Sequence, residues 1–387
     1  MRECAPKIYR SAKPDITALM VFSRNFRLSR KKQLFSAVLI TCLITILFLT
    51  ISIPVPGVVM NLYYWVKPDK GVSCHYIKTD RANSLKDISD TYPKEGRSIF
   101  FHETSCNSFR NGKITITARQ ACAVESAARM NPDYDVYLLY ASPGTYKMED
   151  TESDRFLMEL LKYRNVRIYH IDMDRYFMNT PVESLWKQQQ MKQSRFAQSH
   201  TSDVLRFLTL WKYGGIYLDL DVIVTKSLDD LGTDFTGFES KTSVAAGILS
   251  FNYTGDGHDF ANSCLEDLKN NFKGHDWGWN GPGTVTRLIK RLCEENNIPK
   301  LVNKTCKGFK IYPPNRFYSI PWWNWKYFFQ EEFLDFVKKQ TADSYLIHVW
   351  NKFSTDTNIS LHYENVPYLN FAKLYCPAVV AQCDRYF

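Results

Sequence analysis

Ser202-Asp203-Val204-Leu205-Arg206 opens the stretch that decides the fold, and Tyr213-Gly214-Gly215-Ile216-Tyr217-Leu218-Asp219-Leu220-Asp221 closes it. Apolar residues recur between these ends at three- and four-residue spacing and predict a helix with Thr201 or Ser202 as its cap. Gly214 can take the left-handed conformation that ends a helix, so we expect the chain to reverse there into a strand.

From Ile216 the pattern alternates, which predicts one strand running through Val222 with Asp219 and Asp221 on the same face. At a rise of about 3.3 Å per residue, the two carboxylates lie roughly 6.6 Å apart along such a strand. Carboxylates at this spacing can share one hard divalent cation, which also accepts phosphate oxygens as ligands. The sequence therefore predicts a metal site on this strand.

Two other Asp-x-Asp pairs provide an internal comparison, namely Asp133 with Asp135 and Asp172 with Asp174. We interpret both as solvated strand or turn faces, because neither lies between apolar residues of a strand. An unpaired carboxylate within an apolar strand is costly, so Asp219 and Asp221 require a compensating partner. Asp203 and Arg206 share a helix face three residues apart, where they can either approach the same cavity or form a surface pair.

Four further segments accompany this stretch in order: Phe100-Phe101-His102-Glu103-Thr104-Ser105, Trp277-Gly278-Trp279-Asn280-Gly281-Pro282-Gly283, Tyr318-Ser319-Ile320-Pro321-Trp322-Trp323-Asn324-Trp325 and Ile347-His348-Val349-Trp350-Asn351-Lys352. Together they resemble the alpha-1,4-glycosyltransferase branch of the Asp-x-Asp glycosyltransferases, over roughly residues 97 to 387. The branch includes alpha-1,4-galactosyl-, insect alpha-1,4-N-acetylgalactosaminyl- and alpha-1,4-N-acetylglucosaminyltransferases.

The resemblance implies a GT-A (Rossmann-like) α/β domain, a UDP-sugar donor and a divalent cation, Mn2+. The implied reaction moves galactose or N-acetylgalactosamine to a glycosphingolipid such as lactosylceramide, in alpha-1,4 linkage and with retention. Front-face and double displacement both stay open, because no nucleophile is evident. Alternatives are N-acetylglucosaminyl or mannosyl transfer to glycoprotein glycans, and a non-catalytic glycan-binding protein of the secretory pathway.

The resemblance also implies roles for individual residues. Asp221, with Asp219 and the late His348, is expected to hold the metal, although His348 can equally be a core histidine. Asp203, Arg206, Asp219 and Asp221 are the expected catalytic residues. The expected donor-binding residues are Tyr217, Asp203, Arg206, Asp219, Asn280, Gly281 and Thr104, the last beside the nucleotide base with His102 and Glu103.

The N-terminal region predicts how the protein is anchored. Residues 1–33 contain nine Lys or Arg and two acidic residues, which accounts for +7 of the formal charge of +9. Leu34 to Ile53 is an uncharged run of 20 residues, long enough to cross a bilayer. The positive-inside rule then gives a cytosolic tail (1–33), a signal anchor (34–56), a polar stem (57–96) and a lumenal catalytic domain (97–387). A cleaved signal peptide is the alternative.

The lumenal composition agrees with this topology. The remaining charge is close to neutral, which excludes a basic nucleic-acid-binding domain. Eight of the ten cysteines fall on the lumenal side, where up to four disulfides can form, and no Cys-x-x-Cys spacing indicates zinc. Asn252, Asn303 and Asn358 begin glycosylation acceptor sequences. These features predict a lumenal face in the secretory pathway, and the resemblance implies the Golgi membrane; the oligomeric state stays undetermined.

Alternating strands and helices at the start of the lumenal region predict a mostly parallel sheet covered on both faces. The expected strands are 98–101, 136–140 and 166–171, and the expected helices are 114–130 and 156–163.

The topology can be tested with protease on intact Golgi vesicles. We expect the bulk of the chain to be protected and only the extreme N-terminus to be lost, because the uncharged run follows five closely spaced basic residues. Digestion of the C-terminal part without detergent would contradict a lumenal catalytic domain.

Overall fold

The structure is a computed structural model that describes residues 38, 40–41, 71–78 and 84–387. The expected tail and nearly all of the expected signal anchor lie outside these residues. Within the described ranges, no helix has both the length and the apolar character needed to span a bilayer. The chain divides into two units, Met1–Leu62 and Tyr63–Phe387, and the elements below belong to the second.

An eight-stranded mixed sheet forms the centre of this unit, in the order β3-β2-β1-β4-β7-β6-β9-β8. Strands β1 to β4 run parallel, whereas β7 is antiparallel to both β4 and β6. The parallel half confirms the expected alternation, and the antiparallel half was not foreseen. The strands are β1 (Ser98–Glu103), β2 (Asp135–Tyr140), β3 (Val166–His170), β4 (Gly215–Leu218), β6 (Phe235–Ser240), β7 (Ser243–Phe251), β8 (Thr305–Cys306) and β9 (Phe309–Tyr312).

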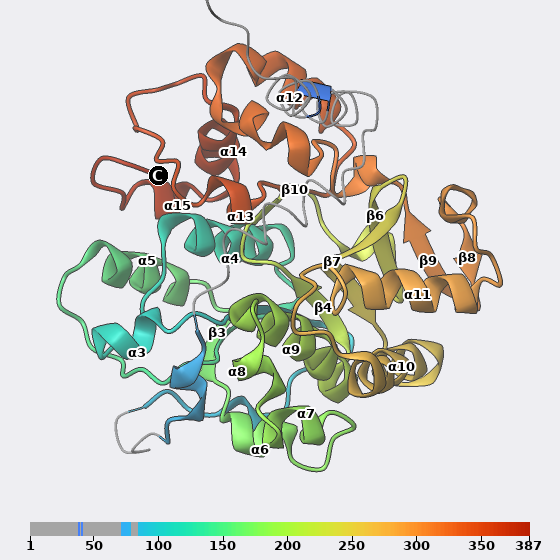
Figure 1. Ribbon diagram of the computed structural model, residues 1–387. Coiled ribbons are helices and arrows are strands. Elements are labelled where there is room, and N and C mark those ends of the chain that lie inside the picture. Colours follow the sequence, from blue (N-terminus) through green and yellow to red (C-terminus); the bar gives the residue numbers. More distant parts are fainter. Residues whose placement is uncertain (1–37, 39, 42–70, 79–83) are drawn as a thin grey trace, which may run out of the picture. The chain divides into compact units, whose positions relative to one another are not determined.

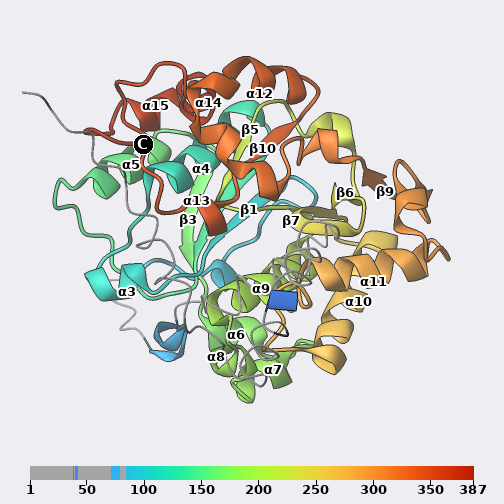
Figure 2. The same ribbon diagram turned by 45° about the horizontal axis from the view of Figure 1, so that its top comes forward.

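Helices cover both faces of the sheet (Figures 1 and 2). On β1, Ile99 and Phe101 join the core beneath α4 and α5, while Phe100 joins the core beneath α9, as the two-residue period of a strand requires. The principal helices are α4 (Ala118–Met130), α5 (Glu152–Leu161), α9 (Ala197–Tyr213), α10 (Gly255–Asn271), α11 (Pro282–Leu292), α12 (Leu334–Gln340) and α14 (Pro367–Tyr375). Shorter ones are α3 (Asn107–Asn111), α6 (Met173–Phe177), α7 (Glu183–Lys187), α8 (Gln190–Gln193), α13 (Asn351–Ser354) and α15 (Pro377–Val380).

Helix α9 begins earlier than the sequence suggested. Its N-cap is Phe196, so the prediction of a Thr201 or Ser202 cap is wrong, and the Thr201 hydroxyl instead donates to the carbonyl of Ala197 within the helix. The C-terminus is as predicted. Gly214 and Gly215 have φ values of +62° and +89°, which residues with a Cβ rarely adopt, and β4 starts at once.

The predicted single strand through Val222 is wrong. Strand β4 ends at Leu218, and β5 (Val222–Val224) pairs antiparallel with β10 (Leu346–His348) in a separate two-stranded sheet. Asp219 and Asp221 therefore lie in the turn that joins the two sheets, instead of on a flat strand face. The change of sheet frees their side chains from the alternation of a strand and brings them next to β10.

The described residues of the expected stem belong to the folded unit. Ile88 is fully buried, His75 Nε2 is 3.0 Å from the Thr104 carbonyl oxygen, and Cys74 is disulfide-bonded to Cys106. The stem prediction of residues 57–96 is therefore wrong for this part of the range. Two more disulfides join Cys122 to Cys376 and Cys293 to Cys306, while Cys264 and Cys383 are free, so the described residues form three disulfides instead of the four considered.

Candidate metal and donor site

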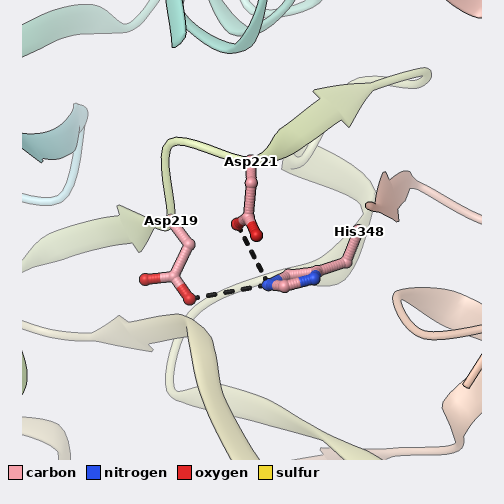
Figure 3. A group of neighbouring side chains, drawn as sticks. All are labelled: Asp219, Asp221 and His348. Carbon is pink, nitrogen blue, oxygen red and sulfur yellow. Dashed lines mark ion pairs between the residues drawn. The ribbon is translucent and has the colours of Figure 1, made fainter. Parts of the chain in front are cut away.

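Three side chains converge at the junction of the two sheets (Figure 3). His348 Nε2 lies 3.2 Å from Asp221 Oδ1 and 3.6 Å from Asp219 Oδ2. One ligand atom from each residue can be chosen so that all lie within 4.8 Å of one another. The structure thus brings together the three residues that the sequence analysis expected to hold the metal.

Backbone hydrogen bonds fix both aspartates in the turn. The Asp219 N–H donates to the Gly247 carbonyl oxygen of β7 at 2.9 Å, and the Val349 N–H donates to the Asp221 carbonyl oxygen at 3.0 Å. Each aspartate is therefore tied to a different sheet, one through β7 and the other through the end of β10. The relative position of the two carboxylates follows from how the two sheets meet.

In each of the three side chains, the outer polar atom, which points away from the other two residues, accepts a hydrogen bond from the protein. The Tyr217 hydroxyl donates to Asp219 Oδ1 at 2.7 Å, and the Asn351 N–H donates to Asp221 Oδ2 at 2.7 Å. The Trp350 N–H donates to His348 Nδ1 at 3.3 Å. Asp219 Oδ2, Asp221 Oδ1 and His348 Nε2 are left facing one another.

Arg206 of α9 compensates the buried charge beneath this trio. Its Nε and one terminal nitrogen donate to the backbone and hydroxyl oxygens of Ser202, and the other terminal nitrogen donates to the Ala246 carbonyl oxygen at 2.7 Å. The same guanidinium lies 3.3 Å from both Asp203 Oδ1 and Asp219 Oδ1, and 4.7 Å above the Tyr217 ring. Arg206 therefore donates three hydrogen bonds to protein oxygens and forms ion pairs with both aspartates.

The charges shift the pKa values in opposite directions. Burial disfavours ionisation of Asp219, but the Arg206 guanidinium and His348 outweigh it and lower the Asp219 pKa to about 2. Burial raises the pKa of Asp221, with His348 opposing and Asp219 adding to the shift. Burial alone would lower the pKa of His348, yet Asp221 and Asp219 raise it above its ordinary value. A cation bound here would compete with protons for His348, so we expect its affinity to fall as the pH is lowered.

This ligand set fits a divalent cation. Two carboxylate oxygens and an imidazole nitrogen suit Mn2+ or a similar ion. Gly247 of β7 leaves space beside them, because a Cβ at this position would lie 2.7 Å from Asp219 Oδ2 and 3.3 Å from His348 Nε2. The outer oxygens of both aspartates are held by protein donors, as oriented carboxylate ligands generally are.

The Asn280-Gly281 loop packs against Asp203. A Cβ on Gly281 would collide with Asp203 Oδ1, so glycine permits this close approach. Asn280 is fully buried, and its side-chain amide forms two hydrogen bonds with the backbone of Lys273. It accepts from the Lys273 N–H at 3.0 Å and donates to the Lys273 carbonyl oxygen at 2.9 Å. Asn280 thus shapes the loop, and Gly281 and Asp203 form its contact with α9.

The residues expected beside the nucleotide base lie at the end of β1. His102 and Thr104 are buried, and His102 Nε2 is 3.0 Å from the Thr209 hydroxyl oxygen. Burial and Arg206 lower the His102 pKa to about 3, which keeps its imidazole neutral. Burial raises the pKa of Glu103 to about 7, with the Ser105 N–H opposing through a hydrogen bond to Oε1.

The other Asp-x-Asp pairs have structural partners, and their interpretation as solvated faces is wrong for Asp135, whereas Asp174 is exposed and Asp172 is partly buried. Asp135 is buried between Lys94 and Arg167, at 3.2 and 3.4 Å. Asp172 caps α6 by accepting from the Arg175 N–H, and Asp174 accepts from Trp186 Nε1 at 2.8 Å. Asp133 is exposed, as expected.

Sequence reasoning missed three residues near the trio. Gly247 lies in an apolar strand with no motif around it, and Tyr318 was noted only as part of a tryptophan-rich segment. Glu239, at the end of β6, is close enough to His348 for its charge to raise the imidazole pKa. Each is distant from Asp219 in sequence, so only the fold brings them to the trio.

Fold and site together define an α/β protein with a candidate cation site at the junction of two sheets, and comparison with known proteins narrows the class of protein. The family described as "Alpha 1,4-glycosyltransferase conserved region" matches residues 253–383, and "Glycosyltransferase sugar-binding region containing DXD motif" matches residues 117–236. Lactosylceramide 4-alpha-galactosyltransferase of Mus musculus is 34% identical over 263 residues, covering 68% of this chain and 69% of that protein. The chain belongs to the alpha-1,4-glycosyltransferase family.

More distant proteins were also found. Human alpha-1,4-N-acetylglucosaminyltransferase is 26% identical, covering 66% of this chain and 74% of its own. Among solved structures, the PaToxG glycosyltransferase matches with a TM-score of 0.36 and 19% identity, over 51% of this chain and 70% of that one.

Replacing Gly247 by alanine tests the site without removing a ligand. The added methyl group would occupy the space beside Asp219 Oδ2 and His348 Nε2, so we expect the Mn2+ affinity to fall by about tenfold or more in calorimetric titration. Gly71→Ala is the control, because no atom lies within 4 Å of a Cβ there. Unchanged Mn2+ affinity in folded Gly247→Ala would show that the cation binds elsewhere.

Proposed function

We propose that this protein is a retaining, Mn2+-dependent alpha-1,4-glycosyltransferase that moves galactose or N-acetylgalactosamine from a UDP-sugar to a glycosphingolipid such as lactosylceramide. The observation that carries the proposal is the convergence of Asp219 Oδ2, Asp221 Oδ1 and His348 Nε2 while protein donors hold their outer atoms. Relatives that are 34% identical and named lactosylceramide 4-alpha-galactosyltransferase support this donor and acceptor.

Within this proposal, the trio holds the cation, which neutralises the negative charge that develops on the departing diphosphate. Asp221 is the main ligand, because Arg206 pairs with Asp219, whereas the ion-pair partner of Asp221 is His348. Arg206 and Tyr217 act as positioning residues. Arg206 forms an ion pair with Asp219 and donates to the Ala246 carbonyl oxygen, and the Tyr217 hydroxyl donates to Asp219. This role replaces the direct donor contact that the resemblance implied for them.

The donor sugar is expected to lie between the trio and the loop that carries Gly281. Asp203 Oδ1 is held by Arg206 on α9, and the absence of a side chain on Gly281 lets the loop approach that carboxylate. Asp203 is therefore the residue of this group best placed to accept from a sugar hydroxyl. Thr104, at the end of β1, is the proposed neighbour of the uracil ring.

We further propose a Golgi location, with the N-terminal run as a signal anchor and the catalytic domain in the lumen. Three disulfides in the described residues agree with an oxidising compartment. Asn303 and Asn358 are exposed acceptors for N-glycans, whereas the Asn252 amide donates to Asp234 Oδ2 at 2.7 Å. A glycan is therefore expected at Asn303 or Asn358 ahead of Asn252.

Converting Asp221 to Asn removes a charge with almost no change in size. Because a catalytic cation supplies several kcal/mol of transition-state stabilisation, we expect kcat to fall by about 100-fold or more. Asp174→Asn is the matched control: the amide oxygen can still accept from Trp186, so turnover should stay within about twofold. Equal losses in both variants, or Mn2+-dependent turnover in Asp221→Asn near that of the parent, would place the metal elsewhere.

Substrates are tested by a panel of UDP- and GDP-sugars with Mn2+, using lactosylceramide and glycoprotein glycans as acceptors. We expect UDP-galactose or UDP-N-acetylgalactosamine to be used with the glycolipid, and the anomeric configuration of the transferred sugar to be retained. Exclusive use of GDP-mannose, or inversion, would contradict the proposal. Transfer of N-acetylglucosamine to a glycoprotein glycan alone would overturn the donor and acceptor assignment and leave the enzyme class intact.

A further inference from the structure

Tyr318 has an unusual environment for a buried tyrosine. Its side chain is 2% exposed, and its ring packs against His348 and Trp350 with centroid separations of 5.4 and 5.6 Å. Its hydroxyl nevertheless has no hydrogen-bond partner among the described residues. Burying a hydroxyl group without a hydrogen-bond partner costs folding free energy. We therefore expect a ligand to supply the missing hydrogen-bond partner of the Tyr318 hydroxyl.

The hydroxyl points into the same space as the trio. The Cβ position of Gly247 is 3.0 Å from the Tyr318 hydroxyl oxygen, 2.7 Å from Asp219 Oδ2 and 3.3 Å from His348 Nε2. The three polar atoms therefore lie close together around the Cα of Gly247, where a side chain would clash with them. A ligand atom bound beside these cation ligands would also come close to the tyrosine hydroxyl.

The chemistry of these groups indicates which kind of ligand atom fits. A phenol carries its proton at neutral pH, so Tyr318 can donate a hydrogen bond, whereas the carboxylate oxygen opposite it is only an acceptor. The positively charged side chain of Arg206 lies nearby, but it already donates three hydrogen bonds to protein oxygens and forms two ion pairs. The partner of Tyr318 must then be an acceptor that also binds beside a divalent cation, and a phosphate oxygen meets both conditions.

We propose that the Tyr318 hydroxyl donates a hydrogen bond to a phosphate oxygen of the donor diphosphate, beside the proposed cation ligands Asp219 and His348. This inference rests on the proposed function, and it adds a binding residue that does not belong to the Asp-x-Asp pair. The hydrogen bond would strengthen as the diphosphate departs, because negative charge then accumulates on its oxygens.

Tyr318→Phe removes the hydroxyl alone. With Mn2+ present, we expect the Kd of UDP to rise about 10- to 100-fold, the range for one hydrogen bond to a charged group. The Kd of uridine, measured by ligand-observed NMR, should not change, because uridine carries no phosphate. Mn2+ affinity without nucleotide should also be unchanged, and the melting temperature should not fall, since no buried group loses a partner.

Tyr368→Phe is the matched control, because this tyrosine is also fully buried and its hydroxyl also has no partner among the described residues. It should leave the Kd of UDP unchanged. Equal UDP affinity in Tyr318→Phe and the parent would overturn the inference. So would a loss of uridine affinity as large as the loss of UDP affinity, or a loss of Mn2+ affinity measured without nucleotide. Failure of the parent to bind UDP would instead contradict the proposed function.

Discussion

The ion pair between Arg206 and Asp219 is the interaction on which the rest of the site depends. Two carboxylates in the same partly buried turn repel each other and lose part of their hydration, so ionisation of both there requires compensation. Arg206 supplies a positive charge from beneath, 3.3 Å from Asp219 Oδ1, and His348 supplies the opposing partner from β10. The cation site is the space left between these two sources of compensation.

This arrangement explains why the site lies where β4 ends. Leaving the large sheet at Leu218 lets the chain place Asp219 against β7 and Asp221 against the end of β10 within three residues. A continuous strand would have separated the carboxylates by about 6.6 Å and kept them on one sheet face. The turn brings both carboxylates next to a single imidazole nitrogen, as Figure 3 shows.

Much of the fold was predictable because its signals are local. The period of α9, the two glycines after it and the alternating apolar runs of β1 to β3 each lie within about 20 residues of sequence. The convergence of Asp219, Asp221 and His348 agrees with the expectation from the sequence, although His348 rested on resemblance alone. The strand break could not be predicted, since Ile216 to Val222 alternates without interruption and only pairing with β10 divides it.

Individual roles were less predictable than positions. Arg206, Tyr217 and Asn280 were expected to contact the donor, yet each directs its polar atoms to other protein groups. Conversely, Gly247 and Tyr318 face the trio although no spacing pattern indicates it. Hydrogen-bond partners depend on contacts between distant segments, so a sequence motif can indicate that a residue belongs to a site without revealing which atoms remain available to a ligand.

The most direct test of the cation site is an anomalous difference map from crystals of the protein grown with Mn2+ and UDP. The account predicts one strong peak bounded by Asp219 Oδ2, Asp221 Oδ1 and His348 Nε2. A peak coordinated by other residues, or a map with bound UDP and no peak between these three side chains, would contradict it.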